Sequence, residues 1–383
     1  MTAERTLEAN VAGSGFCRID LAQGFIAAVR RLGREDLSAV YCAPGFVDLQ
    51  INGLAGVNFS SADLSVDEII RVLPALWATG CTSFCPTLIT NSRENLERNF
   101  KLLELARKTV PGFAESAPCY HLEGPFLSTG ASRGTHDPTL MRDPDWEELE
   151  FLQRAAGGNI GILTLAPEKK GALELIAKGR AAGIVMALSH TDGTAEDIHR
   201  AAAAGATLNT HLGNGCPSMI HRHNAAFWGQ LADDALAAGI ICDGFHLPAD
   251  LIRIIFRVKG IAGCALVTDA VHVAGLPPGR YTLVGIPIEL LPSGQVVTVE
   301  GHSMAGSTLT MDRAISNMMR LAGLSLPEAL HCATTTPADV LKRPSVCARI
   351  AVGQPANLAL FSVTDGNLQI KQTILNGQSV YTG

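Results

Sequence analysis

The sequence predicts an α/β fold: a (β/α)8 barrel of the TIM type with a small β-sandwich domain built from both termini. From Pro44 onward, short apolar or β-branched runs alternate with helical stretches rich in Ala, Leu and Glu, which is the pattern of a parallel sheet. Eight strand–helix units over roughly 300 residues favour a barrel with insertions. Strand-like segments without a helical period lie at both ends of the chain.

The predicted barrel elements follow one another along the chain. The strands are expected at residues 45–50, 81–88, 119–123, 160–166, 184–189, 207–210, 240–242 and 265–268. The helices between them are expected at 93–107, 146–156, 170–182, 195–204 and 249–258. A hairpin-like segment, 279–299, interrupts the last unit, and two further helices at 308–322 and 326–334 follow it.

The terminal segments predict the second domain. Short apolar pieces broken by Gly, Asp and Arg fill the first 43 residues, and the tail from Ile350 has two hairpin turn pairs, Asp365-Gly366 and Asn376-Gly377. We therefore expect residues 1–43 and 346–383 to form one small β-domain and residues 44–345 to form the barrel.

Composition excludes several classes of protein. The chain has 383 residues with 30 Lys and Arg against 36 Asp and Glu, and no basic run, which argues against a nucleic-acid surface. A hydrophobic content of 47% excludes a mainly disordered chain. No apolar run is long enough for a membrane span, and no secretory signal is visible. Ten scattered cysteines without a CxxC pair predict reduced core thiols in a cytoplasmic protein.

Polar residues stand where four predicted strands end: Glu123, His190, His211 and Asp269. In a barrel this end is the catalytic face. Two imidazoles and a carboxylate can supply three ligands of a tetrahedral zinc site, and a carboxylate beyond them can take a proton from the water in the fourth position. Each residue alone could be a hydrogen-bonding or capping residue. Their joint occurrence at four strand ends predicts a metal site.

Eight segments carry a resemblance to a known family. They read PGFVDLQING, HLEGPFL, SRGTHDP, SHTDGT, THLGNGCP, DGFHLP, LVTDA and MAGSTLTMDRA. In this order and spacing the chain resembles the N-acetylglucosamine-6-phosphate deacetylases of the amidohydrolase superfamily. The resemblance covers nearly the whole barrel, and it implies a barrel with a small β-domain from both termini.

The resemblance also implies residue roles. Glu123, His190 and His211 match the metal ligands, and Asp269 matches the proton-transferring acid and base. His246 matches a residue near the scissile amide, where it is a candidate to stabilise the developing oxyanion. Further matches to substrate-contacting positions are Thr135, His136, Asn214, Gly215, Arg222, Asp243, Met304, Ala305 and Gly306. The family often presents the Arg from the neighbouring subunit, so we expect a homodimer.

Residues of the first predicted barrel strand indicate how many metal ions to expect. Many amidohydrolases bind a second metal through His-x-His there and a modified Lys on the fourth strand. This chain has Gln50 and Asn52 at the first positions and no Lys before Glu168 at the second. Because amides are poor ligands, we expect one divalent metal per chain, zinc by default, with Fe, Co or Mn as alternatives. Gln50 is expected to hydrogen-bond the metal-bound water or to line the site.

One loop departs from the family pattern. After the second ligand His the family reads roughly Asn-Ala-Met-Pro and then Arg-Glu-Pro-Gly, whereas this chain has residues 214–217 as Asn-Gly-Cys-Pro and 222–225 as Arg-His-Asn-Ala. The phosphate contact is therefore left open, although Arg222 still offers a bidentate donor. His221, His223 and His272 are left open between pocket and surface, and His302 is expected at the surface.

The predicted activity is metal-dependent hydrolysis of the acetamide of an N-acetyl amino sugar, N-acetylglucosamine 6-phosphate first among the candidates, to acetate and the free amine. A hydrolase on the same scaffold that acts on an unphosphorylated N-acetyl sugar, another N-acyl compound or a cyclic amide stays an alternative, because barrels host many chemistries. A non-catalytic barrel subunit is the alternative of another class. No nucleic-acid or membrane partner is expected.

Overall fold

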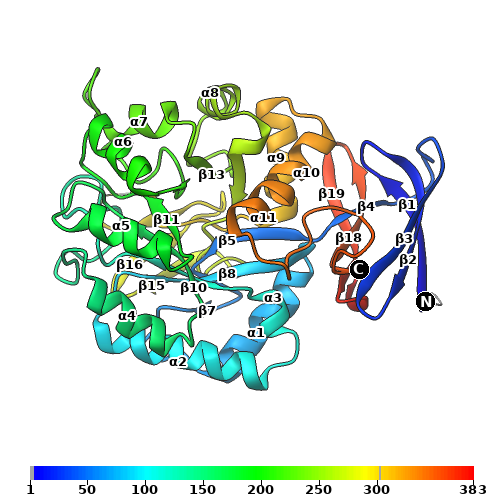
Figure 1. The fold of residues 1–383 in the computed structure, drawn as a ribbon, viewed down its shortest axis with the longest axis horizontal. Helices are drawn as coiled ribbons and strands as arrows, with labels where there is room; N and C mark the ends of the chain where they lie inside the picture. The colour runs from blue at the N-terminus through cyan, green and yellow to red at the C-terminus, as the bar shows by residue number, and fades with distance from the viewer. Residues whose placement is uncertain (1–3, 302) are drawn as a thin grey trace.

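The computed structural model describes residues 4–301 and 303–383, and its largest part is an eight-stranded parallel sheet. The strand order is β14-β13-β12-β11-β10-β9-β8-β5, and the two end strands also meet, at a bridge between Ile51 and Ala270, so the sheet is nearly closed into a barrel (Figure 1). The strands are β5 (Phe46–Ile51), β8 (Cys81–Ile89), β9 (Tyr120–Glu123), β10 (Ile160–Leu165), β11 (Val185–Leu188), β12 (Leu208–Asn209), β13 (Ala237–Ile241) and β14 (Cys264–Val267). The predicted barrel is confirmed.

Helices surround the barrel (Figure 1). They are α1 (Val66–Trp77), α2 (Arg93–Thr109), α3 (Phe113–Ser116), α4 (Trp146–Ala155), α5 (Ala172–Ala181), α6 (Ala195–Ala204), α7 (Ala226–Ala232), α8 (Ala249–Lys259), α9 (Met311–Ala322), α10 (Leu326–Ala333) and α11 (Thr335–Leu341). Capping boxes start α1 at Ser65 and α6 at Thr194, where side chains satisfy the first free N–H groups. The predicted helix at 195–204 has the observed bounds.

Some elements differ from the predicted ones. Strand β13 begins at Ala237 rather than at Ile240, because Ala-Ala-Gly has little strand propensity of its own but is buried between neighbouring strands. The predicted helix at 308–322 begins only at Met311. Helix α11 directly follows α10 and was not predicted. Each difference lies where tertiary packing, rather than local pattern, sets the boundary.

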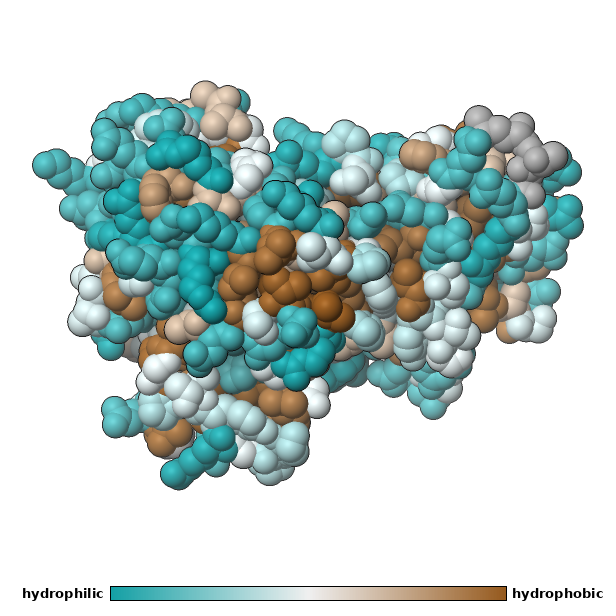
Figure 2. Space-filling model, turned by 90° about the horizontal axis from the view of Figure 1, so that it is seen from below, coloured by the Kyte–Doolittle hydropathy of each residue, from teal (hydrophilic) through white to brown (hydrophobic). Residues whose placement is uncertain are grey.

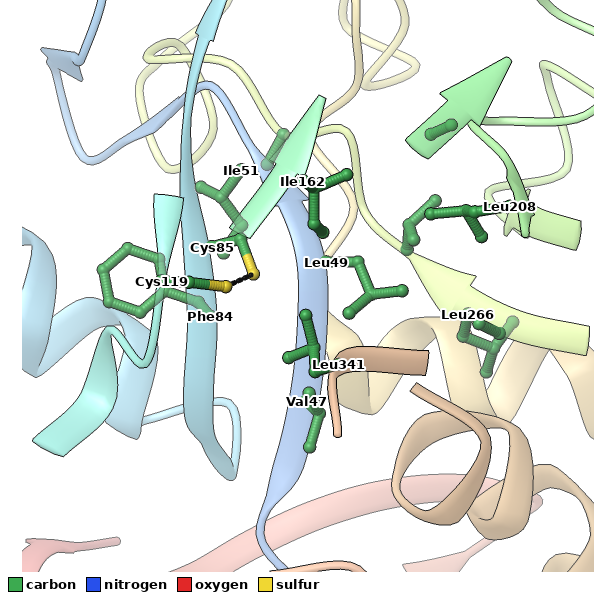
Figure 3. Close-up of a cluster of buried hydrophobic side chains, with 14 of the residues drawn as sticks. Val47, Leu49, Ile51, Phe84, Cys85, Cys119, Ile162, Leu208, Leu266 and Leu341 are labelled. Carbon is green, nitrogen blue, oxygen red and sulfur yellow. Dashed lines mark hydrogen bonds between the residues drawn. The ribbon is translucent and has the colours of Figure 1, made fainter. Parts of the chain in front are cut away.

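The barrel interior is packed with apolar side chains. Figure 3 shows Val47 and Leu49 of β5 close to Leu341 of α11, and Leu208 of β12 and Leu266 of β14 belong to the same cluster. In the same region the Sγ atoms of Cys85 and Cys119 lie 3.6 Å apart as free thiols (Figure 3). All ten cysteines are free and all but Cys216 are buried, which confirms the predicted core thiols.

The small domain is one seven-stranded sheet that bends over its own core (Figure 1). Its order is β20-β19-β18-β4-β1-β2-β3, so the two ends of the chain share it. The strands are β1 (Arg5–Val11), β2 (Gly15–Ala22), β3 (Phe25–Gly33), β4 (Tyr41–Pro44), β18 (Leu358–Thr364), β19 (Asn367–Leu375) and β20 (Gln378–Thr382). Apolar residues from both groups of strands, including Ile19 and Leu358, form one cluster inside it. The domain boundaries 1–43, 44–345 and 346–383 stay a prediction.

The segment predicted as a hairpin forms three antiparallel strands, β15 (Gly279–Leu283), β16 (Ile286–Leu290) and β17 (Val296–Thr298). The third strand was not predicted. A turn in which Leu291 N–H donates to the Gln295 carbonyl returns the chain onto β16. This small sheet buries its own apolar cluster against Val271 and Val273, which follow the last barrel strand. It therefore covers the carboxyl end of the barrel. Two further short strands, β6 (Gly53–Leu54) and β7 (Val57–Asn58), form a hairpin after β5, and a 3-10 helix (Ile261–Gly263) precedes β14.

The outer surface is mostly polar. Seen from below, Figure 2 shows hydrophilic residues over most of that face, around one apolar area near its middle. Of the helices that the structure describes, none is both long and apolar enough to span a membrane.

Candidate active site

The four predicted chemical residues meet at the carboxyl end of the barrel. Glu123 is the last residue of β9, and His190, His211 and Asp269 follow β11, β12 and β14. The last three have left-handed backbones, with φ of 48°, 32° and 51°. Such conformations cost non-glycine residues on the order of 1–3 kcal/mol and cluster at functional sites. Three of the four candidate residues therefore have strained backbones at the carboxyl end of the barrel.

Glu123, His190 and His211 present three donor atoms to one point. His211 Nε2 lies 2.8 Å and His190 Nε2 3.3 Å from Glu123 Oε1, and the two Nε2 atoms lie 3.2 Å apart. These separations are close to the roughly 3.3 Å edge of a tetrahedron with zinc–nitrogen bonds of about 2.0–2.1 Å. The three donors therefore fit a tetrahedral divalent ion.

The other nitrogen of each ring is already held. His190 Nδ1 lies 2.9 Å from the Ser132 carbonyl oxygen, so it carries the proton and donates. His211 Nδ1 lies 3.2 Å from Ser189 Oγ. Contacts of this kind fix the ring and the tautomer that leave Nε2 for a metal.

A third imidazole joins the cluster. One donor atom each from Glu123, His136 and His190 all lie within 4.8 Å of one another. The His136 ring lies 4.5 Å from that of His190, and its Nδ1 contacts Thr90 Oγ1 at 2.9 Å. Burial, helped by His190, lowers the pKa of His136 to about 3, so the ring is neutral. The structure thus adds a potential ligand at a residue matched only to substrate contact in the sequence.

The charge balance of the cluster favours an ionised carboxylate. Burial alone would raise the pKa of Glu123, but the charge of His211 and hydrogen bonds from His190 and His211 hold the pKa well below its ordinary value. Burial likewise acts to lower the pKa of His211, but the Glu123 carboxylate outweighs it and the pKa is raised. A buried anionic oxygen beside imidazoles is a donor set that divalent transition metals accept.

Two amides connect the carboxylates. Gln50 Nε2 donates to Glu123 Oε2 at 2.9 Å and to Asp269 Oδ1 at 3.1 Å, and Asn52 Nδ2 donates to Asp269 Oδ1 at 2.6 Å. Burial raises the pKa of Asp269 to about 6, with the positive charge of His211 acting against it. Because N–H groups point at both carboxylates where a second metal would need lone pairs, this arrangement supports the expectation of one metal.

A cavity of about 360 Å³ opens over the cluster. His246 lines it. The Asp243 carboxylate accepts from the backbone N–H of His246 at 2.9 Å and from its ring Nδ1 at 2.6 Å. The sequence-predicted residues that line the cavity are Asn52, Glu123, Thr135, His136, His190, His211, Asn214, His246, Asp269, Met304 and Gly306.

Other predicted residues lie elsewhere. Gly215 packs against β11, and Ala305 is fully buried. Gln50 is buried beneath the cavity and contacts it only through the carboxylates. Arg222 is exposed, and the described residues that line the cavity include no Lys or Arg. The described part of this chain therefore places no Lys or Arg in the wall of this cavity, and Arg133 lines the adjoining pocket beside Gly134 and Thr135.

The structure places the three histidines whose position, in the pocket or at the surface, the sequence left undecided. His221 and His223 are exposed, and His272 is buried with an Nδ1 that has no hydrogen-bond partner among the residues that the structure describes. His302, expected at the surface, lies outside the described residues.

Comparison with known proteins agrees with this geometry. The model described as "Amidohydrolase family" matches residues 41–380. This chain belongs to the amidohydrolase family. It is 34% identical over 368 residues to the bovine N-acetylglucosamine-6-phosphate deacetylase, covering 92% of this chain and 87% of that protein. It is 30% identical to an Escherichia coli N-acetylgalactosamine-6-phosphate deacetylase, with 94% of each chain covered.

Solved structures agree with the sequence relatives of this amidohydrolase. A crystal structure of the N-acetyl-D-glucosamine-6-phosphate deacetylase of Mycobacterium smegmatis has a TM-score of 0.88 at 31% identity, covering 99% of this chain and all of that one. A mutant of the same enzyme in complex with N-acetyl-D-glucosamine-6-phosphate has a TM-score of 0.89 at 30% identity. The resemblance predicted from the sequence motifs is confirmed.

Sequence reasoning missed several residues of this amidohydrolase site. Ser132 and Ser189 hold the two ligand-candidate rings, and Ser189 directly precedes His190, so its position beside a strand end was a usable signal. Leu283 of β15 closes part of the cavity wall. Nothing local marks Leu283, because its contact depends on how the inserted sheet folds back over the barrel.

Proposed function

We propose that this amidohydrolase is a metal-dependent deacetylase of an N-acetyl amino sugar, with N-acetylglucosamine 6-phosphate as its substrate, and that it releases acetate and the amino sugar phosphate. The observation that carries the proposal is the convergence of Glu123, His190 and His211 on one point beside Asp269, at the mouth of the barrel. Relatives at 30% identity or more, over most of their length, are named deacetylases of such sugar phosphates.

The proposed cofactor is one divalent ion per chain, zinc by default, held by Glu123, His190 and His211. The two imidazoles and one carboxylate suit zinc and also accept Fe, Co or Mn. When bound, such an ion polarises the amide carbonyl and lowers the pKa of water. His136 would stand close enough to contact either the ion or the substrate.

Asp269 is proposed to move the proton. Both amides, Gln50 and Asn52, donate to its Oδ1, and within the described residues its Oδ2 makes no hydrogen bond. Oδ2 is therefore the oxygen that can accept the proton of the attacking water and return it to the leaving amine. A carboxyl pKa of about 6 is close to neutral, as efficient proton transfer in both directions requires.

His246 is proposed to stabilise the developing oxyanion. Its Nδ1 donates to Asp243 Oδ2 at 2.6 Å, so only the protonated ring has a second N–H, on Nε2. The contact with Asp243 holds the ring at the cavity wall, where the protonated ring would present Nε2–H to a developing negative charge.

The 6-phosphate is proposed to be bound by a residue from outside the described cavity lining. The described cavity residues of one chain offer it no Lys or Arg, and Arg222 is exposed on the loop before α7. We therefore propose a homodimer in which Arg222 of a second copy meets the phosphate. A location in the cytoplasm is proposed because all ten cysteines are free thiols, the state that a reducing compartment maintains.

The test is acetate release from a panel of substrates: N-acetylglucosamine and N-acetylgalactosamine, each with and without the 6-phosphate. We expect the 6-phosphate of N-acetylglucosamine to be hydrolysed with the highest kcat/KM. Asp269→Asn, which keeps the shape of the side chain, should lower kcat by roughly 10²–10⁴-fold with metal content unchanged. A preference for a plain sugar supports the alternative amidohydrolase activity, and metal-loaded protein inactive on the whole panel contradicts the deacetylase.

A further inference from the structure

Asp48 is a fully buried carboxylate outside the cavity wall. It lies on β5, two residues before Gln50, and makes three hydrogen bonds. Its Oδ1 accepts from the backbone N–H groups of Gln50 at 3.1 Å and Thr268 at 3.2 Å, and its Oδ2 accepts from Thr268 Oγ1 at 2.5 Å. Two of the three donors belong to Thr268, the residue that follows β14, which lies beside Asp48's own strand.

This contact lies at the seam where the barrel closes. Within the described residues, β14 and β5 share no continuous ladder, and only the isolated bridge between Ile51 and Ala270 joins them. Asp269 N–H donates to the Gln50 carbonyl at 3.0 Å, and Asn52 N–H to that of Ala270 at 2.8 Å. The side chain of Asp48 therefore joins β5 to the end of β14 where these two strands lack the hydrogen bonds of a continuous ladder.

Thr268 connects Asp48 to Asp269, the next residue in the chain. Its Oγ1 accepts from Ala270 N–H at 3.2 Å and its carbonyl accepts from Ser307 Oγ at 2.5 Å, so bonds hold it on both sides of Asp269. Asp269 itself has the left-handed φ of 51°, a conformation that persists only where its surroundings over-determine it. The hydrogen bonds of Thr268 help to hold Asp269 in this conformation.

We infer that Asp48 is a positioning residue, which anchors Thr268 and Gln50 and thereby holds the Asp269 carboxylate in place for proton transfer. The inference rests on the proposed function, because it gives Asp269 the proton-transfer role. Asp48 contacts neither the cavity nor the metal-ligand candidates among the described residues, so it acts through its neighbours alone.

The first test compares variants that keep or remove these hydrogen bonds. Asp48→Ala should lower kcat about tenfold or more while KM and bound metal stay within about threefold, because misplacement of a reacting group acts on the chemical step. Asp48→Asn keeps an oxygen for both N–H groups and should restore most of kcat. Asp312→Asn, which changes another largely buried carboxylate, on α9, is the control and should leave kcat unchanged.

If Asp48→Ala does not fold, Thr268→Val and Thr268→Ser provide the same comparison. Valine removes the hydroxyl that Asp48 Oδ2 accepts from, whereas serine keeps it. We expect the valine variant to lose kcat and the serine variant to stay within about threefold of the parent. A lower melting temperature with unchanged kcat in the alanine or valine variant overturns the inference, since it shows a structural role only.

A double-mutant cycle tests whether Asp48 acts through Asp269. In the Asp269→Asn background, Asp48→Ala should cost no further kcat, because the group that it positions is already gone. A second loss that multiplies the first overturns the inference and leaves the proposed function intact. If Asp269→Asn alone keeps the parent kcat, the proposed role of Asp269 fails, and the inference fails with it.

Discussion

At the scale of single residues, neighbouring groups hold one polar atom each of His190, His211 and Asp269. Ser132 and Ser189 hold the Nδ1 atoms of His190 and His211, and two amides hold Asp269 Oδ1. The two Nε2 nitrogens then face Glu123 Oε1, and Asp269 Oδ2 makes no hydrogen bond among the described residues. The neighbours of the site therefore decide which atom of each group can do chemistry.

The first prediction concerns the metal. His211→Ala removes one of three donor atoms that lie 2.8–3.3 Å from one another, so the variant should lose most bound metal and nearly all activity. Elemental analysis of purified protein measures this. His199→Ala, which changes an exposed His that pairs with Asp233, should keep the metal of the parent. One full equivalent in His211→Ala contradicts the ligand set, and two equivalents in the parent contradict the mononuclear site.

The second prediction is a pH dependence of stability at Asp48. Burial raises the pKa of Asp48 to about 7, although hydrogen bonds from Thr268 and Gln50 act against it. Between the unfolded pKa near 3.9 and about 7, the folded chain holds a proton that the unfolded chain has lost. This group's contribution to stability is therefore full at low pH and is lost as pH rises towards 7.

Asp48→Asn removes that titration. The free energy of unfolding of the parent minus that of the variant should fall by about 3 kcal/mol between about pH 4.5 and about pH 7.5. Urea unfolding of both proteins at both pH values checks it. Because the comparison uses a difference, titration of the buried histidines cancels. An equal difference at the two pH values would show that Asp48 has an ordinary pKa.

At the scale of elements, the loop after β12 packs against the end of β11. A Cβ atom on Gly215 would lie 1.9 Å from Ser189 Oγ and 2.5 Å from the backbone nitrogen of His190. The Gly215 carbonyl also accepts from Thr191 N–H at 3.2 Å. The glycine, which stands where the resembling family has Ala, is thus required by contact with two residues that build the metal cluster.

The third prediction follows from that contact. Gly215→Ala, although it restores the family's residue, must displace Ser189 or His190, at a cost of about 1–3 kcal/mol. We expect a loss of kcat/KM of roughly tenfold or more and weaker metal binding. Gly33→Ala on β3, where no atom lies within 4 Å of the added Cβ, should behave as the parent. Parent-like kinetics and metal content in Gly215→Ala would refute the packing argument.

Strand ends were the most predictable elements of the site. Glu123, His190, His211 and Asp269 each lie at or just after the end of a short buried strand, and parallel strands bring such positions to one edge. The position of Leu283 was not predictable, because it depends on an inserted sheet that folds back over distant residues. The local sequence pattern therefore predicts where a residue lies within an element. Which residues line the cavity depends on contacts between elements, which the local pattern does not give.

At the scale of the whole molecule, the charge of the cavity lining bears on the proposed anionic substrate. The described lining carries Glu123 and Asp269 but no Lys or Arg. A cation beside a phosphate dianion would offset the charge of these carboxylates. A second copy that offers Arg222 would provide it.

The fourth prediction tests that supply. Arg222→Ala should lower kcat/KM for the 6-phosphorylated sugar by about 2–3 kcal/mol, or roughly 30- to 150-fold, and should barely change activity on the plain sugar. Arg253→Ala, another exposed arginine, on α8, is the control. Steady-state kinetics on both sugars and the mass in solution by light scattering decide it. An equal effect on both sugars, or a monomer that is fully active on the phosphorylated one, rules out the proposed contact.

The arrangement of the whole chain was predictable in outline. Asp365 and Asn376 have φ of 51° and 46°, followed by glycines at 76° and 79°, as the turn pairs in the sequence indicate for tight hairpins. That β4 pairs with both β1 and β18 was not predictable, because no local pattern specifies a partner so far along the chain.

The shared sheet has a consequence for biosynthesis. Chains emerge from the ribosome with the N-terminus first, so β1 to β4 are made before every other element. One edge of β4 then stays unpaired until Leu358 and its neighbours arrive, after nearly the whole barrel has been translated. Unpaired strand edges promote aggregation. A nascent or truncated chain therefore exposes an aggregation-prone edge of β4, which is covered only when β18 has been translated and pairs with it.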